Sequence, residues 1–290
     1  MVKLRSCVQV CVDGMRRWPS IPRVWVVALS CAFLYSQLCL PLARLARAQE
    51  TPLNLFEPFI AIGSTLPRLA VLLAGYLLIL SDAPFFHPSE INALYRTGKT
   101  VWFAGKLLYL FVTTTLYLLL ILLFTVVTVS GYAFHANVWS TLGELSASSN
   151  ISIEEHLGMS LDAQVIASML PWQAMVHTFL LLWLYCCFSA LVMLLINMRH
   201  QQVFGYVGAA ALYVLGFLAQ SGDFPLLYWL SPLQNAMLAS HDFGYQRVSM
   251  PTLCQSYALL SGGGLLLVAL AFLRIRSYGF SFSKRLSKYE

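Results

Sequence analysis

Six long apolar runs constrain this chain more than any other feature of its sequence. A helix needs about 20 apolar residues to cross the ~30 Å hydrocarbon core of a bilayer. Lipid offers no partner to backbone N–H and C=O groups, so each run that crosses must be helical. The sequence therefore predicts an all-α polytopic membrane protein with six spans, at roughly 24–42, 66–86, 101–132, 172–198, 203–221 and 252–273.

Charged residues make up only 10% of the 290 residues, against about 25% in a typical soluble domain. So few charges cannot cover a soluble protein of this length, which argues against a soluble enzyme, a disordered chain and a disulfide-stapled secreted module. The net charge is +6. Because the lysines and arginines flank the apolar runs and form no single basic stripe, we expect no nucleic-acid partner.

Lysine and arginine are distributed unequally between the two sides of the predicted bundle. They gather before the first span, between the second and third spans, and in the tail 274–290, whereas the stretch 131–171 has none. Positive residues favour cytoplasmic loops. We therefore predict that both termini are cytoplasmic, that 131–171 is an outer stretch, and that residues 1–290 form one transmembrane domain.

The first apolar run also resembles a secretory signal peptide, because Ala46-Arg47-Ala48 follows it as a cleavage site would. The leader before the run is long, however, and Arg44 and Arg47 crowd the supposed cleavage site. We favour a retained helix.

The loop between the second and third runs carries the signals of a short helix. Pro88 and Ser89 could start it, Glu90 stands in its first turn, and Arg96 and Lys99 stand in its last turn. Gly98 is placed to end it. Ile91, Leu94 and Tyr95 share one face at helical spacing. The same segment loosely matches a phosphate-binding loop, but membrane spans flank it on both sides, so we expect no nucleotide site. An interfacial anchor and a docking surface for a soluble partner both remain open.

Polar groups inside or beside the spans are candidates for a transport pathway. Arg68 follows Pro67, which suits a helix start, so we place Arg68 at the outer interface and residues 54–65 along the outer leaflet. The alternative is a deep functional arginine. Thr114 and Tyr117 could line a path, although threonines in a span more often bond to their own helix.

Ser231 and Pro232 read as an N-cap followed by a first-turn proline. Leu233, Met237 and Leu238 follow in a mostly apolar pattern. This predicts a short re-entrant or surface helix before the sixth span, with an ordinary capped loop as the alternative.

Catalytic and metal-binding patterns are missing from the sequence. The six histidines are scattered, no paired-cysteine zinc spacing occurs, and no acidic pair lies within a span. Most of the seven cysteines lie in or beside apolar runs, which favours packing, although Cys7 and Cys11 could be acylated or bind metal. We therefore predict no enzyme activity, no metal and no cofactor in this chain.

Several segments together resemble the membrane permease subunits of ABC exporters of the type-2 class. The resemblance covers most of the chain and rests on six spans with both termini inside, together with soft motifs: Asn54-Leu-Phe-Glu57-Pro58-Phe59, Ser81-Asp82-Ala83-Pro84-Phe85-Phe86, Arg96-Thr97-Gly98-Lys99-Thr100-Val101-Trp102 and Tyr228-Trp229-Leu230-Ser231-Pro232.

The resemblance implies a coupling helix at Ser89–Arg96 that seats in a soluble ATP-binding subunit, which would hold the ATP and Mg²⁺. The residues it implies for coupling are Pro84, Phe85, His87, Ser89, Glu90, Ile91, Leu94, Tyr95, Arg96 and Lys99. The pathway or gate candidates are Arg68, Thr114, Tyr117, Ser231 and Pro232. A second permease chain, identical or different, would complete the pathway in a bacterial plasma membrane. The alternative is a multi-pass sensor or immunity-type protein that binds a ligand through its outer stretch; an integral-membrane enzyme ranks last.

Overall fold

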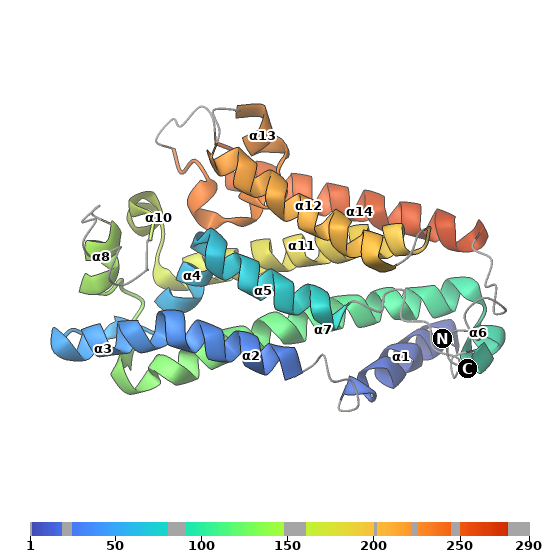
Figure 1. Cartoon of the computed structure of the whole chain (residues 1–290), viewed down its shortest axis with the longest axis horizontal. Coiled ribbons are helices and arrows are strands. Elements are labelled where there is room, and N and C mark those ends of the chain that lie inside the picture. Colours follow the sequence, from blue (N-terminus) through green and yellow to red (C-terminus); the bar gives the residue numbers. More distant parts are fainter. Residues whose placement is uncertain are drawn as a thin grey trace.

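The computed structural model describes residues 2–18, 25–80, 91–147, 161–199, 202–221, 225–244 and 250–277. These residues form a helical bundle whose long helices run along one axis (Figure 1). The long helices and the helices next to them are α1 Val2–Met15, α2 Trp25–Leu34, α3 Leu40–Ala48, α4 Glu57–Ser64, α5 Leu66–Ile79, α6 Ile91–Thr97, α7 Lys99–Val129, α11 Pro171–Asn197, α12 Gln202–Ser221 and α14 Leu253–Ser277. The shorter elements are the π-helix η3 Tyr35–Cys39, the 3₁₀ turns η5 Ser130–Tyr132, η6 Gln234–Ala236 and η7 Leu238–Ser240, the helices α8 Thr141–Ala147, α10 Ala163–Ser168 and α13 Pro225–Leu230, and the strands β1 Leu53–Asn54 and β2 Ala133–Phe134.

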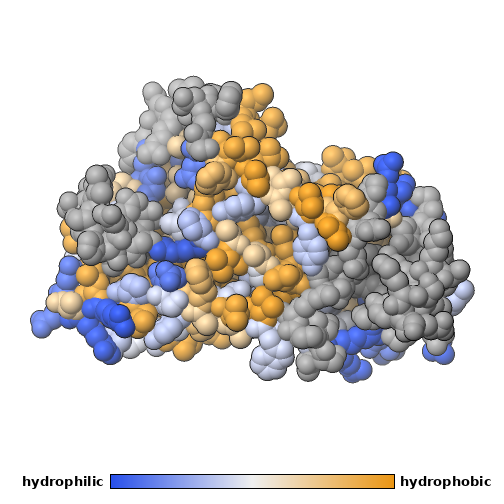
Figure 2. Space-filling view, in the orientation of Figure 1, coloured by the Kyte–Doolittle hydropathy of each residue, from blue (hydrophilic) through white to orange (hydrophobic). Residues whose placement is uncertain are grey.

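Five helical segments of the described chain are long and apolar enough to cross a membrane: Trp25–Ala48, Lys99–Tyr132, Pro171–Asn197, Val203–Gln220 and Leu253–Arg276. A sixth segment is the pair α4 and α5, which meet at 90°. The chain is therefore a helical protein with several candidate membrane spans, as predicted. Figure 2 shows apolar side chains gathered along the middle of one face, with hydrophilic ones toward its two ends.

The first span extends further than predicted, from Trp25 to Ala48. Its middle is the π-helix η3, and Pro41 stands at the start of α3. Because proline has no N–H to donate to the preceding turn, a locally widened turn before it is a familiar way to keep such a helix continuous.

The second span begins at Leu66, as predicted, and α5 ends at Ile79; residues 81–86 of that prediction lie outside the described part of the chain. The preceding segment, residues 54–65, which we predicted to lie along the outer leaflet, contains α4. Every residue from Glu57 to Gly63 is buried by protein. Thr65 is extended (φ −119°, ψ 126°), which turns the chain between the two helices. At the bend, a Cβ on Gly63 would lie 2.5 Å from Thr178 of α11, so glycine permits this close approach.

Helix α1 was not predicted; we had expected only a basic leader before the first span. It packs along the first half of α7, where Gly105 lies so close that an added Cβ would be 2.7 Å from Val10 Cβ. Trp18 Nε1 donates a hydrogen bond to the Tyr109 hydroxyl at 2.9 Å. Cys11 is buried in this contact, which contradicts its acylation and supports packing.

Four of the other cysteines fit the packing interpretation, whereas Cys7 is half-buried and Cys254 is exposed. All seven are free, and Cys31, Cys39, Cys186 and Cys187 are buried. Lys106, near the start of α7, is 1% exposed. Its ammonium lies 5.6 Å from the ring centre of Trp102.

Candidate functional site

Helix α6 lies between the second and third apolar segments, at the end of the bundle that also holds α1 (Figure 1). Gly98 ends it as predicted, with φ +79° and its N–H donating to the Leu94 carbonyl at 2.9 Å. Only glycine adopts that backbone conformation without strain. The next residue, Lys99, begins α7, so α6 is joined to the longest helix by a single residue.

Two details of the predicted coupling helix are corrected. Lys99 does not lie in the last turn of α6, because the left-handed Gly98 has already ended that helix. Leu94 and Tyr95 do not share one environment: Leu94 is 7% exposed and anchors the helix, whereas Tyr95 is 78% exposed. Adjacent residues point about 100° apart on a helix, so burying Leu94 turns Tyr95 outward. Arg96 is also exposed.

Several predicted coupling residues cannot be placed. Ile91 begins α6, but its side chain lies outside the described part of the structure. The remaining ones that lie outside it altogether are Pro84, Phe85, His87, Ser89 and Glu90.

Thr114 and Tyr117, two of the gate candidates, are buried side chains of α7 that form hydrogen bonds with α5. The Tyr117 hydroxyl donates to the Leu72 carbonyl at 2.7 Å, and the hydroxyls of Tyr76 and Thr114 are 2.6 Å apart. Thr114 also donates to the Leu110 carbonyl of its own helix. Both residues are buried, so they join the two helices and border no open path in this conformation.

Arg68, one of the gate candidates, stands near the start of α5, behind Pro67 as expected. Only 7% of it is exposed, so its side chain is packed against protein. Its position at the outer interface stays a prediction.

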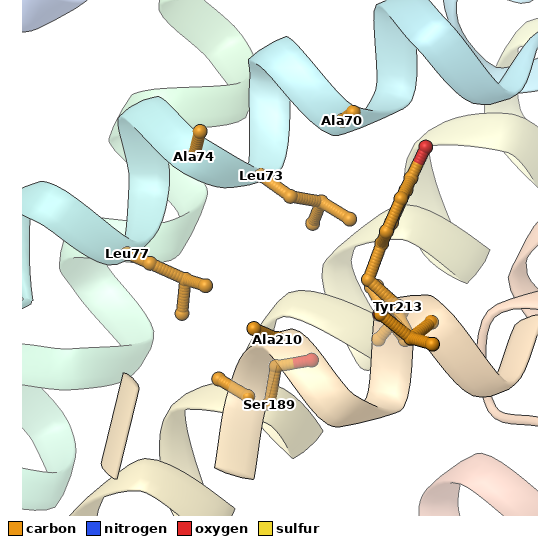
Figure 3. A pocket seen from close by; sticks show the side chains of 10 residues that line it. Ala70, Leu73, Ala74, Leu77, Ser189, Ala210 and Tyr213 are labelled. Atoms are coloured by element: carbon orange, nitrogen blue, oxygen red, sulfur yellow. The ribbon is translucent and has the colours of Figure 1, made fainter. Parts of the chain in front are cut away.

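A cavity of about 200 Å³ opens where α5, α11 and α12 meet (Figure 3). Alanines at Ala70 and Ala74 of α5 and at Ala209 and Ala210 of α12 leave the space. Its polar atoms come from side chains such as Ser189 and Tyr213, and the Tyr213 hydroxyl donates to the Leu66 carbonyl at 3.0 Å. None of the predicted gate residues lines this cavity. Alanines four residues apart in a leucine-rich span were the signal that could have located it.

The segment before the last span is buried, as predicted for a re-entrant element, but it is not a regular helix. Ser231 is a coil residue that accepts a 3.4 Å hydrogen bond from the backbone N–H of Gln234, and Pro232 lies in the turn that follows it. The chain then forms the 3₁₀ turns η6 and η7, in which Leu233 and Leu238 pack inward.

Side-chain amides hold this segment in place. Gln234 Nε2 donates to the Gly216 carbonyl of α12 at 2.8 Å. The Ser256 hydroxyl of α14 donates to Asn235 Oδ1 at 2.7 Å, and His241 Nε2 lies 2.8 Å from the same hydroxyl. Residues on two long helices are thereby linked to one loop.

His241 gives this network a dependence on pH. Burial lowers the pKa of His241 to about 4, from about 6.5 in an unfolded chain. The positive charge that His177 of α11 gains on protonation would disfavour a second one on His241. Between about pH 6.5 and 4, His241 is therefore protonated in the unfolded chain but neutral in the folded chain. The free energy of unfolding falls as the pH drops through this range.

We expect His241→Gln to remove that component of the pH dependence. In the wild-type chain, this histidine should lower the free energy of unfolding by about 3 kcal/mol as the pH falls from about 6.5 to 4. Thermal unfolding in detergent at pH 7.5, 6, 5 and 4 measures it. His135→Gln is the matched control, because His135 is exposed. Parallel pH profiles for wild type and His241→Gln would contradict the prediction.

Glu57 is a buried residue whose role the sequence did not reveal. It begins α4 and is 0% exposed. Its carboxylate accepts hydrogen bonds from the Ser140 backbone N–H at 2.7 Å and from the Ser140 hydroxyl at 2.6 Å. Asn54 lies beside it and donates from Nδ2 to the carbonyls of Ala136 and Val138. Together these bonds, with the short pairing of β1 and β2, attach part of the stretch 131–171 to the bundle.

Among the described residues, no group of three His, Cys, Asp or Glu side chains is arranged to hold a metal ion. No model of a known protein family matches the chain, and no similar protein is found among curated proteins or solved structures.

Proposed function

We propose that this chain is the membrane-spanning permease subunit of an ATP-driven exporter of the ABC type-2 class. In this proposal six spans cross a bacterial plasma membrane, with α4 and α5 together forming the second span and with both termini in the cytoplasm. A separate soluble subunit binds ATP and Mg²⁺, and a second permease chain completes the pathway.

The observation that carries the proposal is the form of α6. A coupling helix needs a side chain that anchors it to the protein, an exposed side chain for its partner and a short connection to the helix that it moves. Leu94 supplies a buried anchor, Tyr95 an exposed aromatic side chain, and Gly98 a one-residue link to the 31-residue α7. Tyrosine is among the residues that contribute most to protein interfaces.

The outward faces of α12 and α14 are apolar, which is consistent with contact with a second chain or with lipid. Val207 and Val214 of α12 and Leu266 and Leu270 of α14 are exposed apolar residues in helices long enough to cross a membrane. The cavity between α5, α11 and α12 adds a small apolar recess beside α12 (Figure 3). It is smaller than the ~300–1,000 Å³ of a typical drug-sized site, so it fits part of an apolar molecule.

The proposal is tested by photo-crosslinking from position 95. A benzophenone amino acid replaces Tyr95 in the full chain expressed in its native host, and the crosslinked partner is identified by mass spectrometry. The expected product contains a soluble protein with a GxxxxGK[ST] phosphate-binding loop. Crosslinks to lipid alone, or to proteins without that loop, would favour the interfacial-anchor interpretation and the non-transport alternative. Val138 is the control position, because it is exposed and lies beyond the opposite end of α7.

A further inference from the structure

A second cavity, of about 390 Å³, lies between the end of α3 and the end of α7. Arg47 and Glu50 line it from one side, and Tyr132 of η5 lines it from the other. Both sides are the ends of apolar segments that could cross a membrane, at Ala48 and at Tyr132. The cavity therefore lies at the level where lipid headgroups and an aromatic belt are found around a membrane protein.

Arg47 is held in a fixed orientation above the Tyr132 ring. Its guanidinium carbon is 3.9 Å from the ring centre. Stacking holds the plane of a guanidinium and leaves the N–H groups at its edge available for a phosphate, which arginine binds with two parallel hydrogen bonds. Within the described part of the chain, Arg47 forms no ion pair.

Glu50 adds a negative charge to the same cavity. It is exposed and has φ +53°, the only left-handed residue other than glycine in the described chain. This conformation ends α3, where the Thr51 N–H donates to the Ala46 carbonyl at 3.1 Å, as at many helix C-termini. An arginine and a glutamate that border one cavity without pairing are complementary to a ligand with both a phosphate and an ammonium.

Thr51 is a further polar group on this cavity. Its hydroxyl is buried and has no hydrogen-bond partner in the described structure. Buried hydroxyls are normally satisfied. The parallel pairing of Leu53 with Ala133 holds the two walls together just beyond it.

We propose that this cavity binds a phosphoethanolamine group, with its phosphate at Arg47 and its ammonium at Glu50. The position at the membrane boundary makes a phospholipid headgroup the expected source, with soluble phosphoethanolamine as the other source of the same chemistry. The proposal does not depend on the exporter function.

Native mass spectrometry of the full chain tests the proposal. The protein is released from micelles that contain equal amounts of phosphatidylethanolamine, phosphatidylcholine and phosphatidylglycerol, and the retained lipids are counted. We expect phosphatidylethanolamine to be retained preferentially, because phosphatidylcholine has no ammonium N–H for Glu50 and phosphatidylglycerol has no ammonium. Arg47→Gln should lower this retention roughly tenfold. Arg44→Gln is the matched control, since Arg44 is exposed on the same helix and does not line the cavity.

Two further variants keep the test decisive if Arg47→Gln folds poorly. Glu50→Gln should remove the preference over phosphatidylglycerol while phosphatidylglycerol is still retained. Arg47→Lys keeps the charge but not the two-pronged contact and should give intermediate retention. Equal retention of the three lipids by wild type, or full retention by Arg47→Gln, would overturn the proposal. A thermal shift in lipid-free detergent with glycerophosphoethanolamine, absent with glycerophosphate, would support the same site with a soluble source.

Discussion

If the chain is the proposed permease, replacing Tyr95 by aspartate is expected to release the proposed ATP-binding subunit and leave the chain folded. Tyr95 is 78% exposed, so no internal packing is lost. A buried tyrosine at an interface commonly contributes about 2 kcal/mol, which corresponds to roughly 30-fold weaker binding. A desolvated aspartate without a counter-charge would weaken it further. The measurement is the affinity of the purified subunit for the permease in nanodiscs, together with ATP hydrolysis by the complex.

Val138→Asp is the control for Tyr95→Asp, because it places the same charge on an exposed apolar residue beyond the other end of α7. It should leave binding unchanged. If Tyr95→Asp retains wild-type affinity, α6 is not the docking surface. If both variants weaken binding equally, the effect comes from general destabilisation.

Among the carboxylates in the described part of the chain, Glu57 is the one whose replacement by alanine is expected to destabilise the protein most. The substitution leaves the Ser140 and Asn54 backbone N–H groups facing a buried space without their acceptor. Hydrogen bonds to charged groups are worth about 1.5–3 kcal/mol each. The relieved cost of burying the carboxylate offsets part of that loss, so we expect a net loss of about 2–4 kcal/mol.

Thermal unfolding in detergent and hydrogen exchange over residues 133–147 measure the effect of Glu57→Ala. Glu57→Gln keeps one acceptor and should show a smaller loss. Glu144→Ala removes an exposed carboxylate of α8 that repels Glu57, so it should stay within about 0.5 kcal/mol of wild type or be slightly more stable. Unchanged protection of residues 133–147 in Glu57→Ala would show that the carboxylate does not attach this stretch.

The sequence predicted the features that depend on local chemistry. Long apolar runs determine the candidate spans, Pro67 predicts where α5 starts, and Gly98 predicts where α6 ends. Each of these signals lies within a few residues of the structure it specifies. None of these features depends on a contact with a residue far away in the sequence.

Features that depend on distant contacts were missed. Glu57 and Ser140 are 83 residues apart, so no local pattern shows that the carboxylate finds two donors there. Helix α1 packs on α7 at Gly105, where a side chain would collide with Val10. The sequence around Gly105 does not show that Val10 lies opposite it. Tyr95 points outward because Leu94 is buried. The sequence of a two-turn helix does not show which of its faces packs against the protein, so this direction could not be predicted.

Cysteine accessibility in spheroplasts tests the central claim most directly, because a coupling helix must face the cytoplasm. Tyr95→Cys and Val138→Cys are introduced separately after the exposed Cys254 is replaced by serine. A membrane-impermeant maleimide should label Val138→Cys in intact spheroplasts and Tyr95→Cys only after the membrane is opened. Labelling of Tyr95→Cys from outside would place α6 on the wrong side for an ATP-binding subunit and contradict the account.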